Sequence, residues 1–151
     1  MLLVGPDHTD GNFKKYVCER GLAEDVLLLG WRDDIPELLS CSDVYVASSR
    51  SEGLGLNVIE AMACNLPVVA FKNRGHCEII KHNRNGFLVN QNDYEEMAKY
   101  VIILYENYKI RNRIITQAQE DISKYEVDSV LNELELIYRK IGERNSDNKK
   151  K

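Results

Sequence analysis

The sequence contains no apolar run that approaches the roughly 20 residues needed to span a bilayer. The first seven residues carry no basic region and only a short apolar stretch, so we do not expect them to act as a signal peptide. Positive charge is also in deficit: the formal net charge is −4, whereas a nucleic-acid-binding domain normally presents a basic face. These absences argue against a membrane-spanning protein and against a nucleic-acid partner.

The four cysteines lack the spacing of a metal or redox site. Cys18, Cys41, Cys64 and Cys77 include no Cys-x-x-Cys pair, and no histidine stands at metal-ligand spacing from them. The sequence also has no Asp-x-Asp motif at the end of an expected strand. We therefore expect reduced cysteines that serve in packing, a cytoplasmic protein, and neither a metal nor another cofactor.

Short apolar segments alternate with helical patterns along the chain. With 151 residues, 44% of them hydrophobic and 29% charged, one domain with a buried core is expected. Strands are predicted over residues 2–4, 26–29, 44–47, 68–71 and 87–89. Helices are predicted over residues 11–20, 35–40, 58–64, from a cap at Asn92 to about residue 108, 111–124 and 127–142. This alternation predicts an α/β fold whose parallel sheet is covered on both faces, with residues 1–144 in the domain and 145–151 as a polar, disordered tail.

Two glutamates bracket a glycine pair between the third strand and the helix that follows it. Gly53 and Gly55 lie in this expected turn, where glycine allows backbone N–H groups to approach a ligand closely. The N-terminus of the following helix offers unpaired N–H groups and a partial positive charge, which suit a phosphate. Glu52 precedes the turn and Glu60 lies within the helix, so each carboxylate is available to accept hydrogen bonds from hydroxyls. A phosphate site between two hydroxyl acceptors suits a nucleotide sugar.

This run, from Ser51 to Ala63, resembles the donor-site signature of retaining glycosyltransferases with the GT-B fold (glycosyl transferases group 1), a family that includes glycogen synthase and many bacterial capsule and lipopolysaccharide transferases. The family pattern has two glutamates separated by seven residues, with Gly-aromatic-Gly after the first and Glu-Ala-Met-Ala at the second; Leu54 replaces the aromatic residue here. The resemblance continues through residues 66–70, 75–78 and 85–89. It implies a doubly wound, Rossmann-like parallel sheet that forms the C-terminal half of a GT-B fold.

The resemblance implies a set of donor-binding residues: Glu52, Gly53, Leu54, Gly55, Leu56, Asn57 and Glu60. Glu52, the candidate catalytic residue, would hold hydroxyls of the donor sugar, and Glu60 would hold those of the ribose. Backbone N–H groups near Gly55 and Leu56 would stabilise the leaving diphosphate. The implied reaction is metal-independent transfer of a hexosyl unit, with retention, from a nucleoside-diphosphate sugar to a saccharide or lipid-linked acceptor in bacterial polysaccharide synthesis.

Four further residues follow other strands at the same expected edge. Trp31 and Arg32 stand where relatives surround the nucleobase, although core packing is an equally good interpretation of Trp31. Arg74 replaces a glycine that is common in the family, and it either supplies positive charge near the phosphates or points to solvent. His76 follows the same strand as Arg74, and a structural or exposed role is the commoner one for such a histidine.

The resemblance also indicates parts that this chain lacks. The family domain begins with one more strand and helix, which carry a basic pair for the diphosphate, and the absent strand is the central one in the order 3-2-1-4-5-6. The acceptor-binding domain would then be supplied in trans, and the isolated chain would be inactive. A gene fragment, a truncated frame and half of a split enzyme all remain open.

Two other functions compete with the transferase. A truncated chain could act as a non-catalytic nucleotide-sugar-binding or assembly module, and a sugar-nucleotide epimerase shares the overall architecture. The glutamate pair and the Glu-Ala-Met-Ala run favour the transferase over the epimerase. A position at the inner face of the cell membrane is also open, with at most a peripheral contact through the three final lysines.

Overall fold

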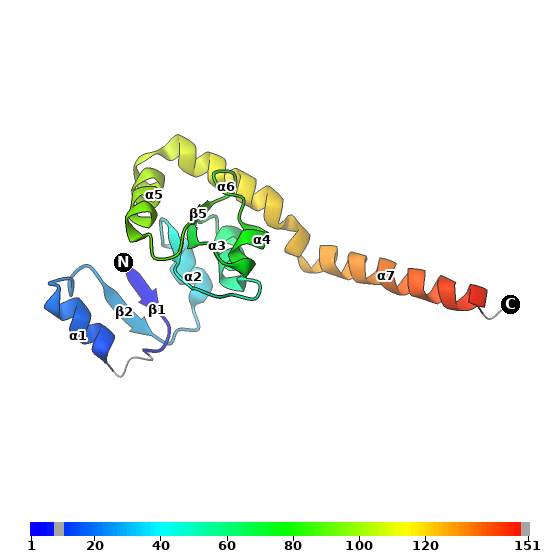
Figure 1. The fold of residues 1–151 in the computed structure, drawn as a ribbon, viewed down its shortest axis with the longest axis horizontal. Helices are drawn as coiled ribbons and strands as arrows, with labels where there is room; N and C mark the ends of the chain where they lie inside the picture. The colour runs from blue at the N-terminus through cyan, green and yellow to red at the C-terminus, as the bar shows by residue number, and fades with distance from the viewer. Residues whose placement is uncertain (8–10, 149–151) are drawn as a thin grey trace. The chain divides into compact units, whose positions relative to one another are not determined.

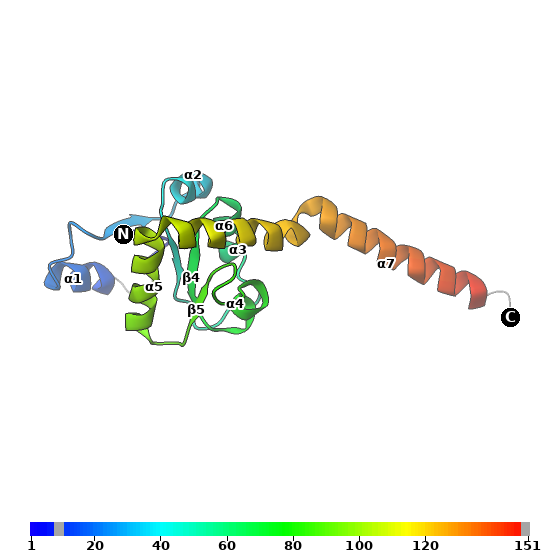
Figure 2. The same ribbon diagram turned by 90° about the horizontal axis from the view of Figure 1, so that it is seen from above.

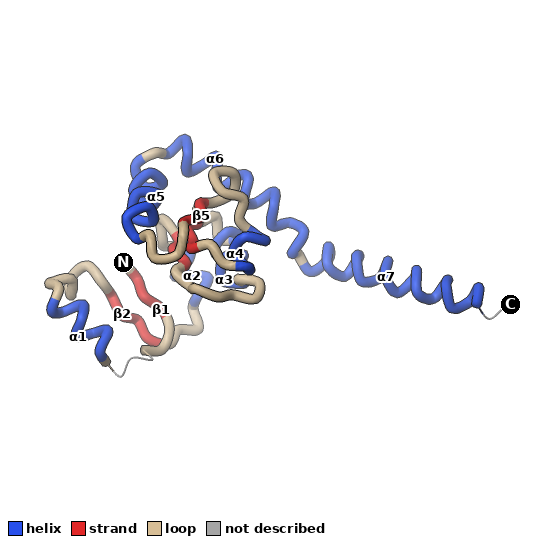
Figure 3. The backbone as a smooth tube through the Cα atoms, in the orientation of Figure 1, coloured by secondary structure: helices blue, strands red, loops and turns tan. Residues whose placement is uncertain are grey.

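The computed structural model of the protein describes residues 1–7 and 11–148, with side chains described as far as residue 141 (Figure 1). The chain divides into two compact units, Met1–Leu38 and Leu39–Lys151. In chain order the elements are β1 (Leu2–Val4), α1 (Asn12–Glu19), β2 (Leu27–Gly30), α2 (Ile35–Ser40), β3 (Tyr45–Ala47), α3 (Leu56–Ala63), β4 (Val68–Phe71), α4 (Arg74–Ile79), β5 (Phe87–Val89), α5 (Tyr94–Glu106), α6 (Tyr108–Ile122), the 3₁₀ turn η1 (Ser123–Tyr125) and α7 (Val127–Asn148) (Figure 3).

The first unit is a β–α–β arrangement. Strands β1 and β2 pair in parallel, with Leu3 opposite Leu28, and α1 connects them. Helix α1 ends where expected: Gly21 adopts a left-handed φ of 67°, and its N–H donates to the carbonyl of Cys18. Glycine stops the helix here because it takes this conformation without the steric cost that a Cβ brings.

The second unit is built on a parallel sheet in the order β3-β4-β5. All four residues of β4 are buried, as expected for the central strand of a sheet that is covered on both faces. Val69 and Phe71 point to one face, where they join a hydrophobic cluster with Leu104 of α5 and Ile114 of α6. Helix α3 packs against β3 and β4 (Figure 2).

A buried asparagine fixes the turn that leads into β5. The Asn85 side chain is fully buried; its Oδ1 accepts from the N–H of Lys81, and its Nδ2 donates to the Ile79 carbonyl and to Asp121 of α6. The next residue, Gly86, leaves no free space for a side chain, because an added Cβ would lie 3.1 Å from the Val68 carbonyl oxygen. The turn is therefore locked to both the sheet and α6.

The α/β class and the parallel pairing of the strands are confirmed. The described strands form two sheets, β1-β2 and β3-β4-β5. Helix α7 extends to Asn148, past the boundary at residue 144 where a polar tail was expected, and residues 149–151 lie outside the described residues. The expectation that residues 1–144 act as one donor-binding domain stays a prediction. Within the described residues, no helix is both long and apolar enough to cross a membrane.

Three local expectations are wrong. Asn92 does not cap α5: it adopts a left-handed φ of 67°, and the cap is Asp93, whose side chain accepts from the N–H of Glu96. Helix α4 was not expected, because a six-residue segment that contains glycine shows no helical periodicity. No disulfide joins the four cysteines, but three of them do not pack in a core: Cys18, Cys41 and Cys77 are exposed, and Cys64 is half-buried.

Candidate functional site

The carboxyl ends of β3, β4 and β5 meet at one edge of the second unit's sheet, because the three strands run parallel. The segments that follow them are residues 48–55, 72–73 and 90–93. Ligands of open parallel sheets bind at this edge. The glycine pair and Glu52, which the sequence singles out, lie in the first of these segments.

Gly55 makes the turn into α3. It is the N-cap residue, with a left-handed φ of 75°, and an added Cβ would lie 3.1 Å from Cδ2 of His76. Both facts require glycine at this position. The Gly55 carbonyl accepts from the N–H groups of Val58 and Ile59, whereas the N–H groups of Leu56 and Asn57 have no hydrogen-bond partner in the part of the chain that the structure describes.

The first turn of α3 is therefore a candidate anion site. No acidic residue lies in this turn, so nothing there opposes the positive end of the helix. Gly53, in contrast to Gly55, has open space around it and no left-handed φ, and Leu54 is 38% exposed. In this turn, the conformation of Gly55 is therefore fixed, whereas Gly53 and Leu54 beside it are open to solvent.

The two glutamates flank this turn. Glu52 is half-buried, and its carbonyl accepts a hydrogen bond from the N–H of Gly75 at 3.2 Å. Glu60 is exposed on α3, one helical turn beyond Leu56. Burial raises the pKa of Tyr45 of β3, and a hydrogen bond with Asn57 partly offsets this. The negative charges of Glu60 and Glu52 raise the same pKa further, so Tyr45 lies within electrostatic reach of both glutamates. The charges of both carboxylates therefore act on the Tyr45 hydroxyl.

Polar side chains connect the three segments at the sheet edge. Gln91 donates to the carbonyls of Arg50 and Lys72, Arg50 donates to Oδ1 of Asn92 at 3.2 Å, and Lys72 donates to Oδ1 of Asn90 at 2.9 Å. These contacts fix the segments relative to one another. They also bring two cations, Arg50 and Lys72, to the edge that carries Glu52, a feature that the sequence interpretation missed.

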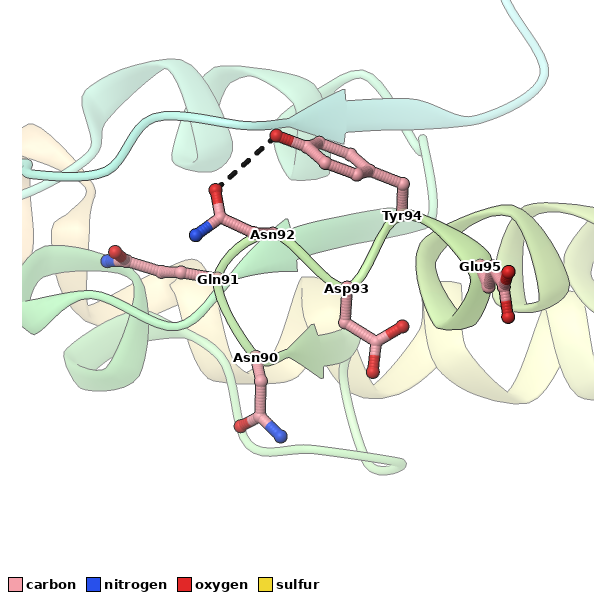
Figure 4. A pocket seen from close by; sticks show the side chains of 6 residues that line it. All are labelled: Asn90, Gln91, Asn92, Asp93, Tyr94 and Glu95. Carbon is pink, nitrogen blue, oxygen red and sulfur yellow. Dashed lines mark hydrogen bonds between the residues drawn. The ribbon is translucent and has the colours of Figure 1, made fainter.

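A shallow, open depression of about 480 Å³ lies over the segment after β5. It is lined by Asn90, Gln91, Asn92, Asp93, Tyr94 and Glu95, and Figure 4 shows the Tyr94 hydroxyl directed at Asn92, with a hydrogen bond of 3.4 Å. The lining is polar and Tyr94 is exposed. Glu52, Glu60 and the glycine turn are not part of this lining, so we build the candidate site on the β3–α3 turn and not on the depression.

The remaining predicted residues have different surroundings. Trp31 is 81% exposed, which rules out the core-packing interpretation. Arg32 makes a bidentate ion pair with Asp34, and this hydrogen bonding lowers the pKa of Asp34. Arg74 is exposed and pairs with Glu78 at 3.6 Å. Trp31 and Arg32 belong to the first unit, and their proposed place near the nucleobase stays a prediction, as does the place of Arg74 near the phosphates.

No group of three or more His, Cys, Asp or Glu side chains could hold a metal ion among the residues that the structure describes. His76, which the sequence interpretation left open between two roles, is completely buried beneath Gly55. Its role in the structure is therefore to support the turn. His8 lies outside the described residues.

Comparison with known proteins gives one family throughout. Residues 1–121 match the protein family described as glycosyl transferases group 1. The chain is 33% identical over 103 residues to the UDP-Gal:alpha-D-GlcNAc-diphosphoundecaprenol alpha-1,3-galactosyltransferase of Escherichia coli, covering 68% of this chain and 27% of that protein. It is 30% identical over 131 residues to the poly(ribitol-phosphate) alpha-N-acetylglucosaminyltransferase of Staphylococcus aureus (strain COL), covering 85% of this chain and 27% of that protein.

Solved structures agree with the sequence matches. The Anabaena protein Alr3699/HepE in complex with UDP-glucose has 31% sequence identity and a TM-score of 0.78, and the match covers 97% of this chain and 40% of that one. The chain therefore spans between about a quarter and two-fifths of the length of these three proteins.

Proposed function

The chain belongs to the glycosyl transferases group 1 family, and from this premise we propose that it binds the nucleoside-diphosphate sugar from which such an enzyme transfers a hexosyl unit. The observation that carries the proposal is the β3–α3 turn. There, the N–H groups of Leu56 and Asn57 have no partner within the described chain, and they lie between two glutamates. The complex of the related HepE with UDP-glucose supports a ligand of this class.

The start of α3 suits the diphosphate. Unpaired N–H groups and the positive end of the helix favour an anion, and this preference grows as negative charge develops on the leaving diphosphate. The turn is held by a glycine that cannot be replaced without strain, so these donors are in place before the ligand arrives. Stabilisation of the leaving group is then the main contribution of this turn to catalysis.

The glutamates suit the two sugars of the ligand. Glu60 is exposed one helical turn, about 5.4 Å, beyond Leu56, so a phosphate at the helix start places the ribose hydroxyls within its reach. Glu52, on the other side of the turn, would hold hydroxyls of the transferred sugar and orient its anomeric carbon. In this arrangement neither carboxylate acts as a covalent nucleophile, and the transfer proceeds with retention and without a metal ion.

The acceptor requires a further part. Because the chain spans only about a quarter to two-fifths of the relatives named above, we propose that an acceptor-binding domain completes the enzyme and that the described chain alone transfers no sugar. Catalysis of a transfer depends on positioning both reactants, and loss of that positioning forfeits several kcal/mol of barrier lowering. The saccharide or lipid-linked acceptor, the cytoplasmic location and a peripheral membrane contact stay predictions.

Calorimetric titration with UDP-glucose and with a range of nucleoside diphosphates tests donor binding. Loss of a charge-assisted hydrogen bond costs roughly 1.5–3 kcal/mol, so Glu60→Ala is expected to weaken the best ligand on the order of tenfold or more. Glu133→Ala is the matched control, because Glu133 is also an exposed helical glutamate but lies on α7. Equal affinities for the two variants would remove Glu60 from the site.

The role of Glu52 predicts a different signature. Glu52→Gln is expected to weaken binding of UDP-glucose while leaving UDP nearly unaffected, because only the sugar nucleotide carries the hydroxyls that Glu52 would hold. Parallel titrations of the two ligands measure this difference. A similar loss for both would mean that the substitution disturbs the turn and that Glu52 does not hold the sugar.

A further inference from the structure

The donor segment, residues 49–55, rests on the first turn of α4. Nδ2 of Asn73 donates to the Ser49 carbonyl at 2.9 Å, which holds the start of the segment. The N–H of Gly75 donates to the Glu52 carbonyl at 3.2 Å, which holds its middle. The ring of His76 lies beneath Gly55, so the end of the segment is held by packing.

The fit between the two segments is tight at Gly75. An added Cβ there would lie 2.9 Å from the Glu52 carbonyl oxygen and 3.0 Å from the carbonyl carbon of Leu54. These are backbone atoms, which cannot move without moving the whole turn. The shape of the donor segment therefore follows the position of α4.

Asn73 joins the two segments through the two halves of its amide. Oδ1 accepts from the N–H of His76 at 2.9 Å and so caps α4, while Nδ2 holds Ser49. Nδ1 of His76 lies 2.8 Å from the Phe71 carbonyl and 3.0 Å from Nδ2 of Asn73. Because the carbonyl can only accept, Nδ1 carries the hydrogen and donates it to Phe71, so Nδ1 does not accept from the Asn73 amide. Nε2 of His76 has no hydrogen-bond partner in the described chain, so the ring supports Gly55 by contact alone.

We propose that Asn73 is a positioning residue of the donor site: its Nδ2 holds the Ser49–Gly55 segment against α4, so that Glu52 and the first turn of α3 meet a nucleoside-diphosphate sugar in the right geometry. The proposal rests on the function proposed above, since it concerns the same ligand. It assigns to Asn73 an effect on binding that is separate from its effect on stability, because the two atoms of one amide serve the two roles.

Serine at position 73 separates these roles. Asn73→Ser keeps an oxygen that caps the helix but removes the amide donor to Ser49. Asn107→Ser is the matched control, because Asn107 caps α6 by accepting from the N–H of Ile110 and makes no contact with the donor segment. Both variants replace an asparagine cap with a serine. If Asn73 served only as a helix cap, the two variants would therefore show similar hydrogen exchange and similar UDP-glucose affinity.

Three measurements on the full chain decide the matter: urea unfolding, amide hydrogen exchange of Gly75 without ligand, whose N–H donates to the Glu52 carbonyl, and calorimetry with UDP-glucose. We expect the urea midpoint of Asn73→Ser to be somewhat lower than that of Asn107→Ser, because the contact with Ser49 is lost as well. Only Asn73→Ser is expected to show faster exchange at Gly75, because its bond to Glu52 opens more often when the segment is loosened, and a UDP-glucose affinity roughly three- to tenfold lower, the range for one net hydrogen bond.

Unchanged exchange in Asn73→Ser would overturn the proposal, and so would faster exchange with unchanged affinity, because the ligand would then not depend on the position of the segment. If the unsubstituted chain binds neither UDP-glucose nor any nucleoside diphosphate, the proposed function fails. The exchange measurement still decides in that case whether Asn73 holds the segment.

Discussion

The left-handed turn at Gly55 allows a quantitative test with a control two residues away. Gly55→Ala forces a Cβ into a backbone conformation with φ of 75°, which costs roughly 1–2 kcal/mol, and the new carbon would lie 3.1 Å from the buried ring of His76. Gly53→Ala makes the same chemical change where there is open space and no left-handed φ. Glycine-to-alanine changes at compatible sites are neutral or stabilising by up to about 1 kcal/mol.

We therefore expect Gly55→Ala to lower the free energy of unfolding by roughly 1–3 kcal/mol, with Gly53→Ala within about 0.5 kcal/mol of the unsubstituted chain or slightly above it. For a chain of this length each kcal/mol corresponds to roughly 2–4 °C in Tm, which a thermal melt resolves. Urea unfolding gives the free energies, and calorimetry with UDP-glucose is expected to show a larger loss for Gly55→Ala. Equal stabilities of the two variants would refute the claim that this turn needs glycine.

Three further predictions concern other parts of the second unit. Leu104→Ala is expected to lower the free energy of unfolding by roughly 2–5 kcal/mol in urea, because Leu104 is completely buried in the hydrophobic cluster; a smaller loss would mean that the cluster collapses around the cavity. Asn65→Gly is expected to stabilise the chain by roughly 0.5–1 kcal/mol, because Asn65 ends α3 with a left-handed φ of 60°; a lower Tm would contradict this. Burial raises the pKa of Tyr45, so above about pH 10 the unfolded chain loses the Tyr45 proton before the folded chain does. The free energy of unfolding therefore falls as the pH rises towards and through the folded-state pKa. Urea unfolding in alkaline buffers is expected to show that this free energy declines less steeply with pH for Tyr45→Phe, and identical slopes for the two chains would contradict it.

The sequence predicted the strands well because their signal is local. The bounds of β1, β4 and β5 agree with the expected ranges residue for residue, as do those of α2. Each of these strands is a short apolar run next to a turn residue, and a run such as Val68–Phe71 is typical of a strand that is buried on both faces. Caps were less predictable: Asn107 starts α6 at Tyr108, earlier than expected, because several adjacent polar residues compete for such positions.

The candidate site was predictable only where a motif marks it. The glutamates and glycines stand in a recognisable run, and the structure confirms a turn at Gly55 before a helix; its left-handed φ is an addition that the structure makes. Tyr45 and Asn73 carry no such mark, because each acts through a partner distant in sequence: Asn57 for Tyr45 and the Ser49 carbonyl for Asn73. A helix as short as α4 depends on tertiary contacts, such as the burial of His76, that no local pattern reveals.

The locked turn at Asn85 and Gly86 has a consequence for the chemical ageing of the protein. In a flexible chain an Asn-Gly pair deamidates readily, because the glycine nitrogen can attack the asparagine side-chain carbonyl and release ammonia through a cyclic imide. In the folded protein, the Asn85 amide is held by Lys81, Ile79 and Asp121, and Gly86 is packed against the sheet, so the attacking geometry is not available. The fraction of molecules in which Asn85 has become an acidic residue, read by mass spectrometry of stored samples, therefore rises with the time that the chains have spent unfolded.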